Sequence, residues 1–467
     1  MSAQTLLWAP RAWLDGAWAD AVLLRADAMG RWAEITSGTP APPQAQGQMQ
    51  EQVQVLPGPV LPSLVDAHSH AFQRAFVGLA ERRDSAHDDF WSWRDRMYGV
   101  ALRITPEQLQ AVATQLYVEL LAGGYTQVCE FHYLHHAEDV KPYSEHEAEE
   151  GAMSRALAAA AQAAGIGLTL LPVLYERAGF KQPQLRVDQR RFATDVARVL
   201  RLRDAVRGWK LPHVSAGVAI HSLRAAAAES IRELAQQLVG DPGPIHIHIA
   251  EQTGEVSDCL EATGARPIEW LVRELALDAR WQLVHATHAT PAEIDAVAAT
   301  GAGVVLCPGT EANLGDGLPD LPRWLAAGVP LSLGSDSQVT RSWPEELRWL
   351  EYGQRLVLRQ RNVAAAPGSQ PATAARLFER MRQGGAAAAG FQRWGLVPGA
   401  RADLLLLDAA QSALCGLPPS HLLDGLIFAA PERPFAQVMV AGRWVGASHL
   451  PSAAFTAAMQ ALWAPAS

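Results

Sequence analysis

The sequence predicts an α/β protein, with a parallel (β/α)8 TIM-like barrel and a small β-sandwich domain formed by the two ends of the chain. The barrel is indicated by eight apolar, strand-like runs that begin at residue 60 and alternate with helical stretches rich in alanine and leucine. The smaller domain is indicated by strand-like patterns at both ends of the chain. An open, doubly wound parallel sheet is the alternative topology for the same alternation.

Length and composition agree with two such parts. The chain has 467 residues, which is long for one domain, although a barrel can reach roughly 250 residues or more with insertions. Hydrophobic residues make up 49% of the chain and charged residues 19%, so a sizeable core is expected and extensive disorder is not. We expect the barrel over residues 59–389 and the β-sheet domain from residues 1–58 together with 390–467.

The expected barrel elements follow one another in a regular alternation. Several of the helices begin with Thr-Pro or Ser-x-x-Glu, which are typical start signals. The candidate strands are 60–68, 126–133, 167–175, 214–221, 244–249, 281–286, 301–307 and 330–336, and the candidate helices include 105–122, 147–164, 224–238, 290–299 and 342–360.

The ends of the chain have a different pattern. Residues 5–36 resemble short strands joined by turns, and residues 40–58 are rich in proline, glutamine and glycine, which suits a surface connection. Strand character returns in residues 399–407 and 436–445. The two ends are therefore expected to meet in one small sheet.

Charge and cysteine usage exclude several classes of protein. The net charge is −9, from 39 basic and 48 acidic residues, and no long run of lysine or arginine suggests a nucleic-acid partner. No leader and no stretch of about 18 apolar residues is evident, so we expect a cytoplasmic protein without a membrane partner. The four cysteines are widely spaced, which suits core residues in a reducing compartment and neither disulfides nor a thiolate zinc site.

Polar residues stand at the carboxyl ends of four predicted strands, where a barrel enzyme carries its chemistry. His68 and His70 are two residues apart in a strand and therefore point the same way. His248, His285 and Asp336 end the fifth, sixth and eighth strands. Imidazoles with one carboxylate suit a divalent metal, above all zinc, with iron, manganese or cobalt also possible.

Some of the neighbouring polar residues have simpler interpretations. His246 points inward only if it shares the register of His248, so it is either a residue behind the site or a core residue. His288 lies beyond its strand and suits a solvent-facing helix start. Glu251 follows the fifth strand, where it is either a proton shuttle or an acid placed favourably at a helix N-terminus.

This arrangement resembles the amidohydrolase superfamily over nearly the whole chain. The matching motifs are His68-Ser-His70, His248-Ile-Ala-Glu251, His285 and Gly334-Ser-Asp336. Members with two metals usually bridge them with a carboxylated lysine at the end of strand four. This chain has Gly217-Val-Ala-Ile-His-Ser-Leu-Arg224 there, without lysine. The resemblance therefore implies one metal ion, most simply Zn²⁺, held by His68, His70, His248 and Asp336.

The His-x-x-Glu motif is similar to that of the deaminase and chlorohydrolase branch of the superfamily. In that branch water is activated by the metal, which lowers the pKa of water toward ~7. The resemblance implies that Glu251 carries a proton to the leaving nitrogen, and that Asp336 is both a ligand and the first base. His285 either ligates the metal or stabilises the reacting centre.

Arginines near the barrel mouth indicate the kind of substrate. Arg94 lies in an aromatic segment, and Arg224 follows the fourth strand. Guanidinium groups bind carboxylates through paired hydrogen bonds, so two of them suggest a dicarboxylate. A surface ion pair is the alternative role for either arginine.

The same stretches resemble the formimidoylglutamate deiminase family within the superfamily. That resemblance implies hydrolysis of N-formimino-L-glutamate to N-formyl-L-glutamate and ammonia, in histidine degradation. It also implies that Gln73, Arg94, Tyr133, His221 and Arg224 hold the substrate. The matching stretches are His68-Ser-His-Ala-Phe-Gln-Arg-Ala-Phe76, Phe90-Trp-Ser-Trp-Arg94, Glu130-Phe-His-Tyr133, His221-Ser-Leu-Arg224 and Glu311-Ala-Asn-Leu-Gly315.

Two other functions remain open at this stage. A deaminase of a heterocyclic amine such as guanine or a pterin is one, because 15 tryptophans allow base stacking. A catalytically silent, metal-binding scaffold is the other. The segment 178–189, rich in Gln, Lys and Arg, has no predicted conformation. A homodimer is possible, although no residue pattern demonstrates it.

Overall fold

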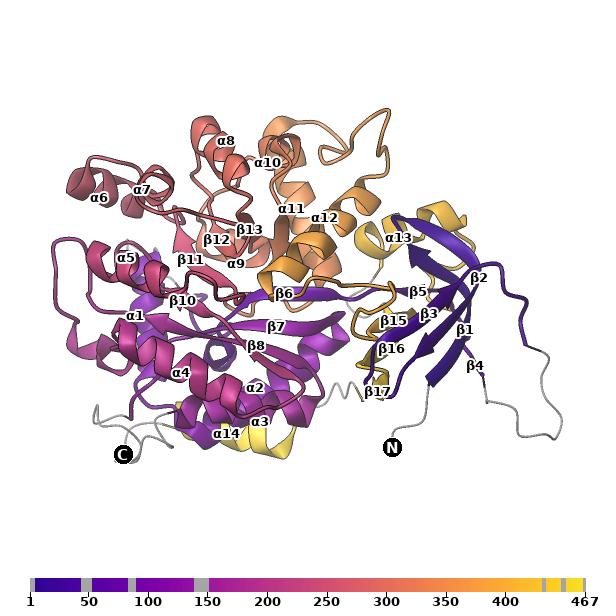
Figure 1. The fold of residues 1–467 in the computed structure, drawn as a ribbon, viewed down its shortest axis with the longest axis horizontal. Helices are drawn as coiled ribbons and strands as arrows, with labels where there is room; N and C mark the ends of the chain where they lie inside the picture. The colour runs from indigo at the N-terminus through magenta and orange to yellow at the C-terminus, as the bar shows by residue number, and fades with distance from the viewer. Residues whose placement is uncertain are drawn as a thin grey trace.

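A closed parallel barrel lies at the centre of the protein (Figure 1). The computed structural model describes residues 5–42, 53–82, 90–137, 151–430, 434–446 and 451–464. Within them the strand order is β10-β11-β12-β13-β14-β6-β7-β8-β9, and β10 also pairs with β8, which closes the ring. The barrel strands are β6 (Leu64–Ser69), β7 (Tyr125–His132), β8 (Gly167–Leu174), β9 (Val214–Ala216), β10 (Val218–Ile220), β11 (Ile245–Ile249), β12 (Trp281–His285), β13 (Gly303–Leu306) and β14 (Leu331–Leu333).

The predicted (β/α)8 barrel is confirmed, and the open sheet is wrong because β14 pairs in parallel with β6. The predicted fourth strand is divided at Gly217 into β9 and β10. A Cβ atom at this glycine would lie 2.3 Å from the carbonyl oxygen of Pro244. The break therefore allows a close approach between neighbouring backbones.

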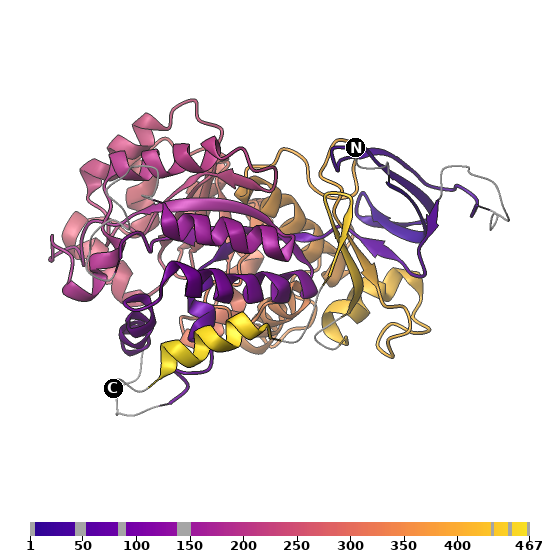
Figure 2. The same cartoon turned by 90° about the horizontal axis from the view of Figure 1, so that it is seen from below.

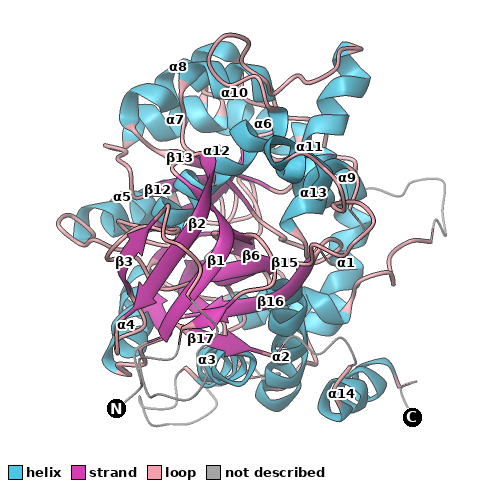
Figure 3. Cartoon of the chain, turned by 90° about the vertical axis from the view of Figure 1, so that its right-hand side faces the viewer, coloured by secondary structure: helices cyan, strands magenta, loops and turns pink. Residues whose placement is uncertain are grey.

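Helices surround the barrel (Figure 3), and their starts follow from local sequence. Thr105 and Thr290 each accept a hydrogen bond from the backbone N–H three residues later, where a Gln or Glu side chain bonds back. The helices are α1 (Phe90–Ala101), α2 (Pro106–Ala122), α3 (Ala152–Ala164), α4 (Val196–Gly208), α5 (Ala228–Gln237), α6 (Thr253–Thr263), α7 (Pro267–Glu274), α8 (Pro291–Thr300), α9 (Pro308–Leu314), α10 (Leu321–Ala327), α11 (Trp343–Leu358) and α12 (Thr373–Ala388).

Both ends of the chain build a second sheet beside the barrel, to the right in Figure 1. Its order is β17-β16-β15-β5-β1-β2-β3, with β4 paired to β1, so β5 joins strands from the two ends. Leu7, Val22, Trp32 and Met439 are buried in a core of its own. The strands are β1 (Thr5–Leu14), β2 (Ala17–Ala26), β3 (Trp32–Thr36), β4 (Gln54–Val55), β5 (Val60–Leu61), β15 (Leu404–Leu407), β16 (Phe435–Val440) and β17 (Arg443–Val445).

The C-terminal part also returns to the barrel. The helices η4 (Pro419–His421) and α13 (Leu422–Phe428) precede β16, and α14 (Ala453–Trp463) lies along α2, as Figure 2 shows. The indole of Trp463 donates a hydrogen bond to the carbonyl oxygen of Ala75 at 3.0 Å.

The division into domains 1–58 plus 390–467 and 59–389 stays a prediction. No helix among the described residues is long and apolar enough to cross a membrane.

A glycine on α12 allows this helix to lie directly against β14. A Cβ atom at Gly384 would stand 2.0 Å from the carbonyl oxygen of Leu331. We expect Gly384→Ala to lower the free energy of unfolding by about 1–3 kcal/mol, measured by chemical denaturation, because the helix must shift. Gly254→Ala on α6 is the control, since its Cβ atom would meet no atom within 4 Å. Equal stability of the two variants would contradict this packing.

Candidate active site

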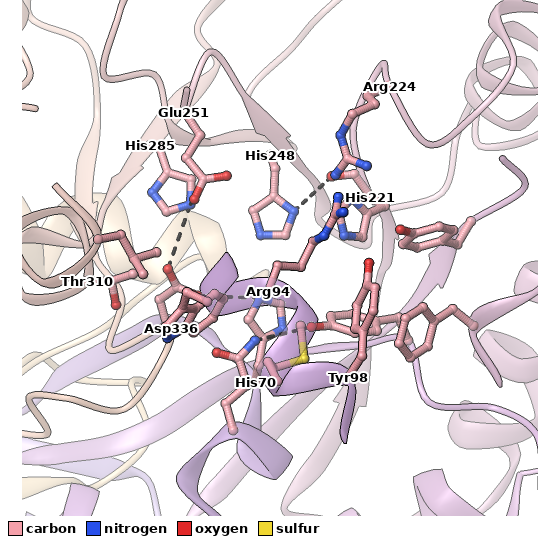
Figure 4. A pocket seen from close by; sticks show the side chains of 17 residues that line it. His70, Arg94, Tyr98, His221, Arg224, His248, Glu251, His285, Thr310 and Asp336 are labelled. Atoms are coloured by element: carbon pink, nitrogen blue, oxygen red, sulfur yellow. Dashed lines mark hydrogen bonds and ion pairs between the residues drawn. The ribbon is translucent and has the colours of Figure 1, made fainter. Parts of the chain in front are cut away.

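Four strand ends bring the predicted metal ligands together. The Nε2 atoms of His68 and His248 are 3.0 Å apart, although they belong to opposite parts of the ring. An Oδ1 of Asp336 lies 3.5 Å from the Nε2 of His68 and 3.4 Å from that of His70. Figure 4 shows His70, His248, His285 and Asp336 directed toward one point.

The backbone is bent where the strands end. His285 and Asp336 have left-handed φ angles of 71° and 48°, and Ala250 has one of 51°. Such conformations cost about 1–3 kcal/mol each and are typical of functional sites. Gly334 supplies the space for this bend, because a Cβ atom there would lie 2.7 Å from the Cβ of His68.

Main-chain hydrogen bonds fix the tautomers of two histidines. The Nδ1 of His70 donates to the carbonyl oxygen of Phe131 at 2.9 Å, and that of His248 to the carbonyl oxygen of His221 at 2.8 Å. A carbonyl oxygen only accepts, so each Nδ1 carries the proton and each Nε2 keeps a lone pair that faces the site. Burial lowers the pKa of both rings, which keeps them neutral.

The donor set fits a divalent metal ion. The ligand atoms of His68, His248 and His285 lie within 4.8 Å of one another, as do those of His68, His70 and Asp336. Neutral imidazoles and a carboxylate are what zinc and related ions bind. Cys307, which is fully buried, forms a third such group with His285 and Asp336, so its thiol lies closer to the site than a core role predicts.

His285 lies among three carboxylates. Its Nδ1 is 3.5 Å from an oxygen of Glu311, and its Nε2 is 3.7 Å from Glu251 and 3.8 Å from Asp336. Burial lowers the pKa of His285, but the carboxylates of Glu251, Asp336 and Glu311 outweigh it and raise this pKa to about 10. The ring therefore carries a positive charge at neutral pH when these acids are ionised.

Glu251 has the properties of a proton carrier. It lies in the pocket, and burial raises the pKa of its carboxyl group to about 7, opposed by His285 and assisted by Asp336. Its backbone N–H and that of Ala250 donate to the carboxylate of Glu255 at 3.0 and 3.1 Å, which fixes the loop. An acid with a pKa near neutrality both takes and gives a proton readily.

The predicted substrate residues line one pocket with these groups. The pocket encloses about 550 Å³, part of it open to solvent, which suits a small molecule. The amide of Gln73 donates to the hydroxyl oxygen of Tyr133 at 3.2 Å. The residues that the sequence predicts and that line the pocket are His70, Gln73, Arg94, Tyr133, His221, Arg224, His248, Glu251, His285 and Asp336.

Two other histidines lie outside this set. The Nε2 of His246 is 2.8 Å from the carbonyl oxygen of Ala388 on α12, so this side chain faces outward from the barrel. His288 is half-buried beyond β12 and does not line the pocket.

His68 is fully buried behind the pocket wall, and its Nε2 atom is the part of the side chain that reaches the metal site.

The sequence did not single out several pocket residues. Tyr175 directly follows β8, so the rule that polar strand ends build the site would have found it. Thr310 lies in the first turn of α9, shortly after β13. Phe192 gave no such signal, because it follows no barrel strand and its place in the pocket is decided by the fold. Trp93, Met97, Tyr98 and Leu314 also line the pocket.

The segment 178–189 has a defined conformation and leads to the pocket residue Phe192. It makes a turn closed by pairing between Gly179 and Gln182 and continues into the 3-10 helix η3 (Val187–Phe192). The guanidinium of Arg191, which is fully buried, donates to the carbonyl oxygens of Ala101, Ile104 and His136. These bonds hold η3 against α1 and place Phe192 in the pocket.

Known proteins with this arrangement identify the family. The model of the Amidohydrolase family matches residues 60–445. The chain belongs to the amidohydrolase family. The expected resemblance is thus confirmed, as is the expected class of enzyme, a hydrolase that acts on carbon–nitrogen bonds.

Individual members of the amidohydrolase family are similar along almost the entire chain. The formimidoylglutamate deiminase of Pseudomonas aeruginosa is 45% identical over 440 residues, which is 94% of each chain. The crystal structure of an amidohydrolase from Brucella melitensis has a TM-score of 0.89 at 41% identity and covers 98% of this chain and 100% of its own. A zinc-bound adenosine deaminase from Xanthomonas campestris shares the fold, with a TM-score of 0.78, 22% identity, and coverage of 98% and 97%.

Removing one ligand tests the metal site. We expect His248→Ala to abolish binding of a divalent metal, measured by mass spectrometry of the purified protein, because its Nε2 faces the site. The control is His246→Ala on the same strand, whose ring faces α12. A His248→Ala protein that retains as much metal as the control would remove this residue from the site.

Proposed function

We propose that the protein hydrolyses N-formimino-L-glutamate to N-formyl-L-glutamate and ammonia. The observation that carries this proposal is the pocket itself, where Arg94 and Arg224 lie together with Glu251, His285 and Asp336. The relative from Pseudomonas aeruginosa, which bears the name of this activity, supports it. A role in histidine degradation, a cytoplasmic location and a homodimer stay predictions.

The metal in this proposal is one zinc ion. His68, His70, His248 and Asp336 would hold it, since their ligand atoms converge and the imidazoles are neutral. When bound, such a metal supplies hydroxide at neutral pH. Residues 217–224, which contain β10 and the loop that follows it, include no lysine that could bridge a second ion.

The two arginines would bind the carboxylates of the substrate. Arg224 is buried and donates to the carbonyl oxygen of Ala178 at 3.3 Å, and Arg94 lies over the ring of Tyr98. Both guanidinium groups line the pocket, where carboxylates bind through charge-assisted hydrogen bonds. Gln73 and Tyr133, bonded to each other, complete the wall beside His70. The formimino carbon would then face the converging histidines.

Two side chains around that carbon transfer protons, and a third stabilises charge. Asp336 is placed to take the proton from the attacking water, and Glu251 to pass a proton to the formimino nitrogen. The proton that remains on the added oxygen is then transferred to the same nitrogen, the carbon–nitrogen bond breaks, ammonia leaves, and the added oxygen becomes the formyl carbonyl. The proton held by Asp336 replaces the one that Glu251 donated. His285, positively charged beside Glu251 and Asp336, stabilises the negative charge that develops on the added oxygen.

A second candidate is a deaminase of a heterocyclic amine. Aromatic rings of Tyr98, Tyr133, Tyr175 and Phe192 line the pocket and suit a flat base. An 8-oxoguanine deaminase of Pseudomonas aeruginosa is 27% identical over 267 residues. The arginines favour the dicarboxylate, because guanidinium groups bind carboxylates through charge-assisted hydrogen bonds that a neutral base cannot form.

An ammonia-release assay decides between the two candidates. We expect release from N-formimino-L-glutamate and none from guanine or 8-oxoguanine at equal concentration, because the pocket carries two guanidinium groups. The metal-loaded protein is used, and its metal content is measured in the same sample. Release from a purine alone would overturn the proposed substrate.

The role of Glu251 is tested by Glu251→Gln. We expect metal content to be unchanged and kcat to fall about 10²–10⁴-fold, because the amide cannot carry the proton. The control is Glu261→Gln, an exposed position on α6 that pairs with Lys181. If the Glu251→Gln enzyme, with its metal, turns over as fast as this control, Glu251 is not the proton carrier.

A further inference from the structure

The segment 178–192 places one glutamine beneath two pocket tyrosines. Gln189 is fully buried, and its Nε2 atom donates to the hydroxyl oxygens of Tyr98 at 3.2 Å and Tyr175 at 3.0 Å. Tyr98 comes from α1 and Tyr175 follows β8, so Gln189 joins three separate parts of the wall. Neither the metal site nor the proton transfers involve this residue.

The orientation of the Gln189 amide is determined by its other bond. The Oε1 atom accepts a hydrogen bond from the backbone N–H of Arg186 at 3.0 Å, so the NH₂ group faces the tyrosines. Its two hydrogens go to two phenol oxygens. Each tyrosine is therefore an acceptor toward Gln189 and must direct its own hydrogen elsewhere.

The hydroxyl hydrogen of Tyr98 cannot be accepted by Gln189. The oxygens of Tyr98 and Tyr175 each accept a hydrogen from the Gln189 amide, which has no lone pair on this side to accept a hydrogen in return. The O–H of Tyr98 remains to bond a further acceptor. Figure 4 shows this hydroxyl directed toward the guanidinium of Arg94.

This corner of the pocket offers donors and positive charge. Arg94 and Arg224 carry charge, and neither the amide of Gln189 nor the arginines can accept the Tyr98 hydrogen. A carboxylate oxygen is the acceptor that such a corner suits, since hydrogen bonds to an ionised group are the stronger kind. The corner therefore selects an acidic substrate over a neutral one.

We propose that Gln189 is a positioning residue that directs the hydroxyl of Tyr98 toward a carboxylate of the substrate. The proposal rests on the proposed function, because that function supplies the carboxylate. Without the amide, both tyrosine oxygens regain a lone pair, and the Tyr98 hydroxyl is no longer restricted to donation. In some of the enzyme molecules the substrate carboxylate then faces a lone pair of the Tyr98 oxygen in place of its hydrogen. The two repel each other, which weakens binding.

The test compares Gln189→Leu and Tyr98→Phe with the wild-type enzyme on three substrates. These are N-formimino-L-glutamate, N-formimino-4-aminobutyrate, which lacks the α-carboxylate, and N-formimino-L-2-aminobutyrate, which lacks the γ-carboxylate. We expect both variants to raise KM for the dicarboxylate about tenfold to a hundredfold with kcat nearly unchanged. For the substrate that lacks the carboxylate at Tyr98, the variants should change KM by less than about twofold.

A matched glutamine distinguishes this role from a general loss of packing. Gln127 is 1% exposed, donates to Thr169 at 2.9 Å, and accepts from Arg401 at 2.7 Å at the other end of the barrel. Gln127→Leu should lower the melting temperature and leave KM unchanged. Equal KM changes for all three substrates, or none for Gln189→Leu and Tyr98→Phe, would overturn the proposal.

The binding of glutarate, measured by calorimetry, tests the role of Gln189 and Tyr98 independently of the proposed reaction. Glutarate carries two carboxylates and no formimino group, so its binding requires no turnover. We expect wild type to bind it more tightly than Tyr98→Phe by about tenfold or more. If wild type and both variants bind it equally, the carboxylate site is wrong. If wild type binds glutarate but releases no ammonia from N-formimino-L-glutamate, only the proposed function fails.

Discussion

The parallel pairing between the first and last barrel strands is the contact on which the site depends. Beyond β14, the backbone N–H of Asp336 donates to the carbonyl oxygen of His68 at 2.9 Å, and that of His70 donates to the carbonyl oxygen of Asp336 at 3.2 Å. Residues 266 or more positions apart in the chain become neighbours at this seam. Ring closure, and not local sequence, therefore sets the distance between the paired histidines and the aspartate.

A buried network stabilises this seam from behind. The carboxyl group of Asp66 accepts from the backbone N–H and the hydroxyl of Ser335 at 2.8 and 2.5 Å, and burial raises its pKa to about 7. The amide of Gln338 donates to the hydroxyl oxygen of Ser69 at 3.0 Å and to the carbonyl oxygen of Asp336 at 2.8 Å. These bonds satisfy polar groups that would otherwise be costly to bury, and they fix the left-handed backbone at Asp336.

The two sides of the pocket differ in their charged and polar groups. On one side neutral histidines and carboxylates converge, and burial and charge place the pKa of Glu251 near 7 and that of His285 near 10. On the other side lie the positively charged guanidinium groups of Arg94 and Arg224 and the hydroxyl groups of the pocket tyrosines. A substrate with a reactive carbon at one end and carboxylates at the other matches this division, which a flat neutral base does not. The anchored segment 178–192 belongs to the second side, and its Gln189 and Phe192 are buried there.

The sequence by itself determined the strand order, the helix starts, the residues at the strand ends and the family, because periodicity and capping are local and the motifs are contiguous. It left His246 undecided, since one residue of register decides which way a strand side chain points. It placed His288 at a solvent-facing helix start, whereas the side chain is half-buried. Only the tertiary structure decided that His246 faces α12, that Tyr98 and Phe192 share the pocket, and that Gln189 joins two tyrosines. These residues lie on loops and separate elements whose paths depend on packing between distant parts of the chain, which no local pattern encodes.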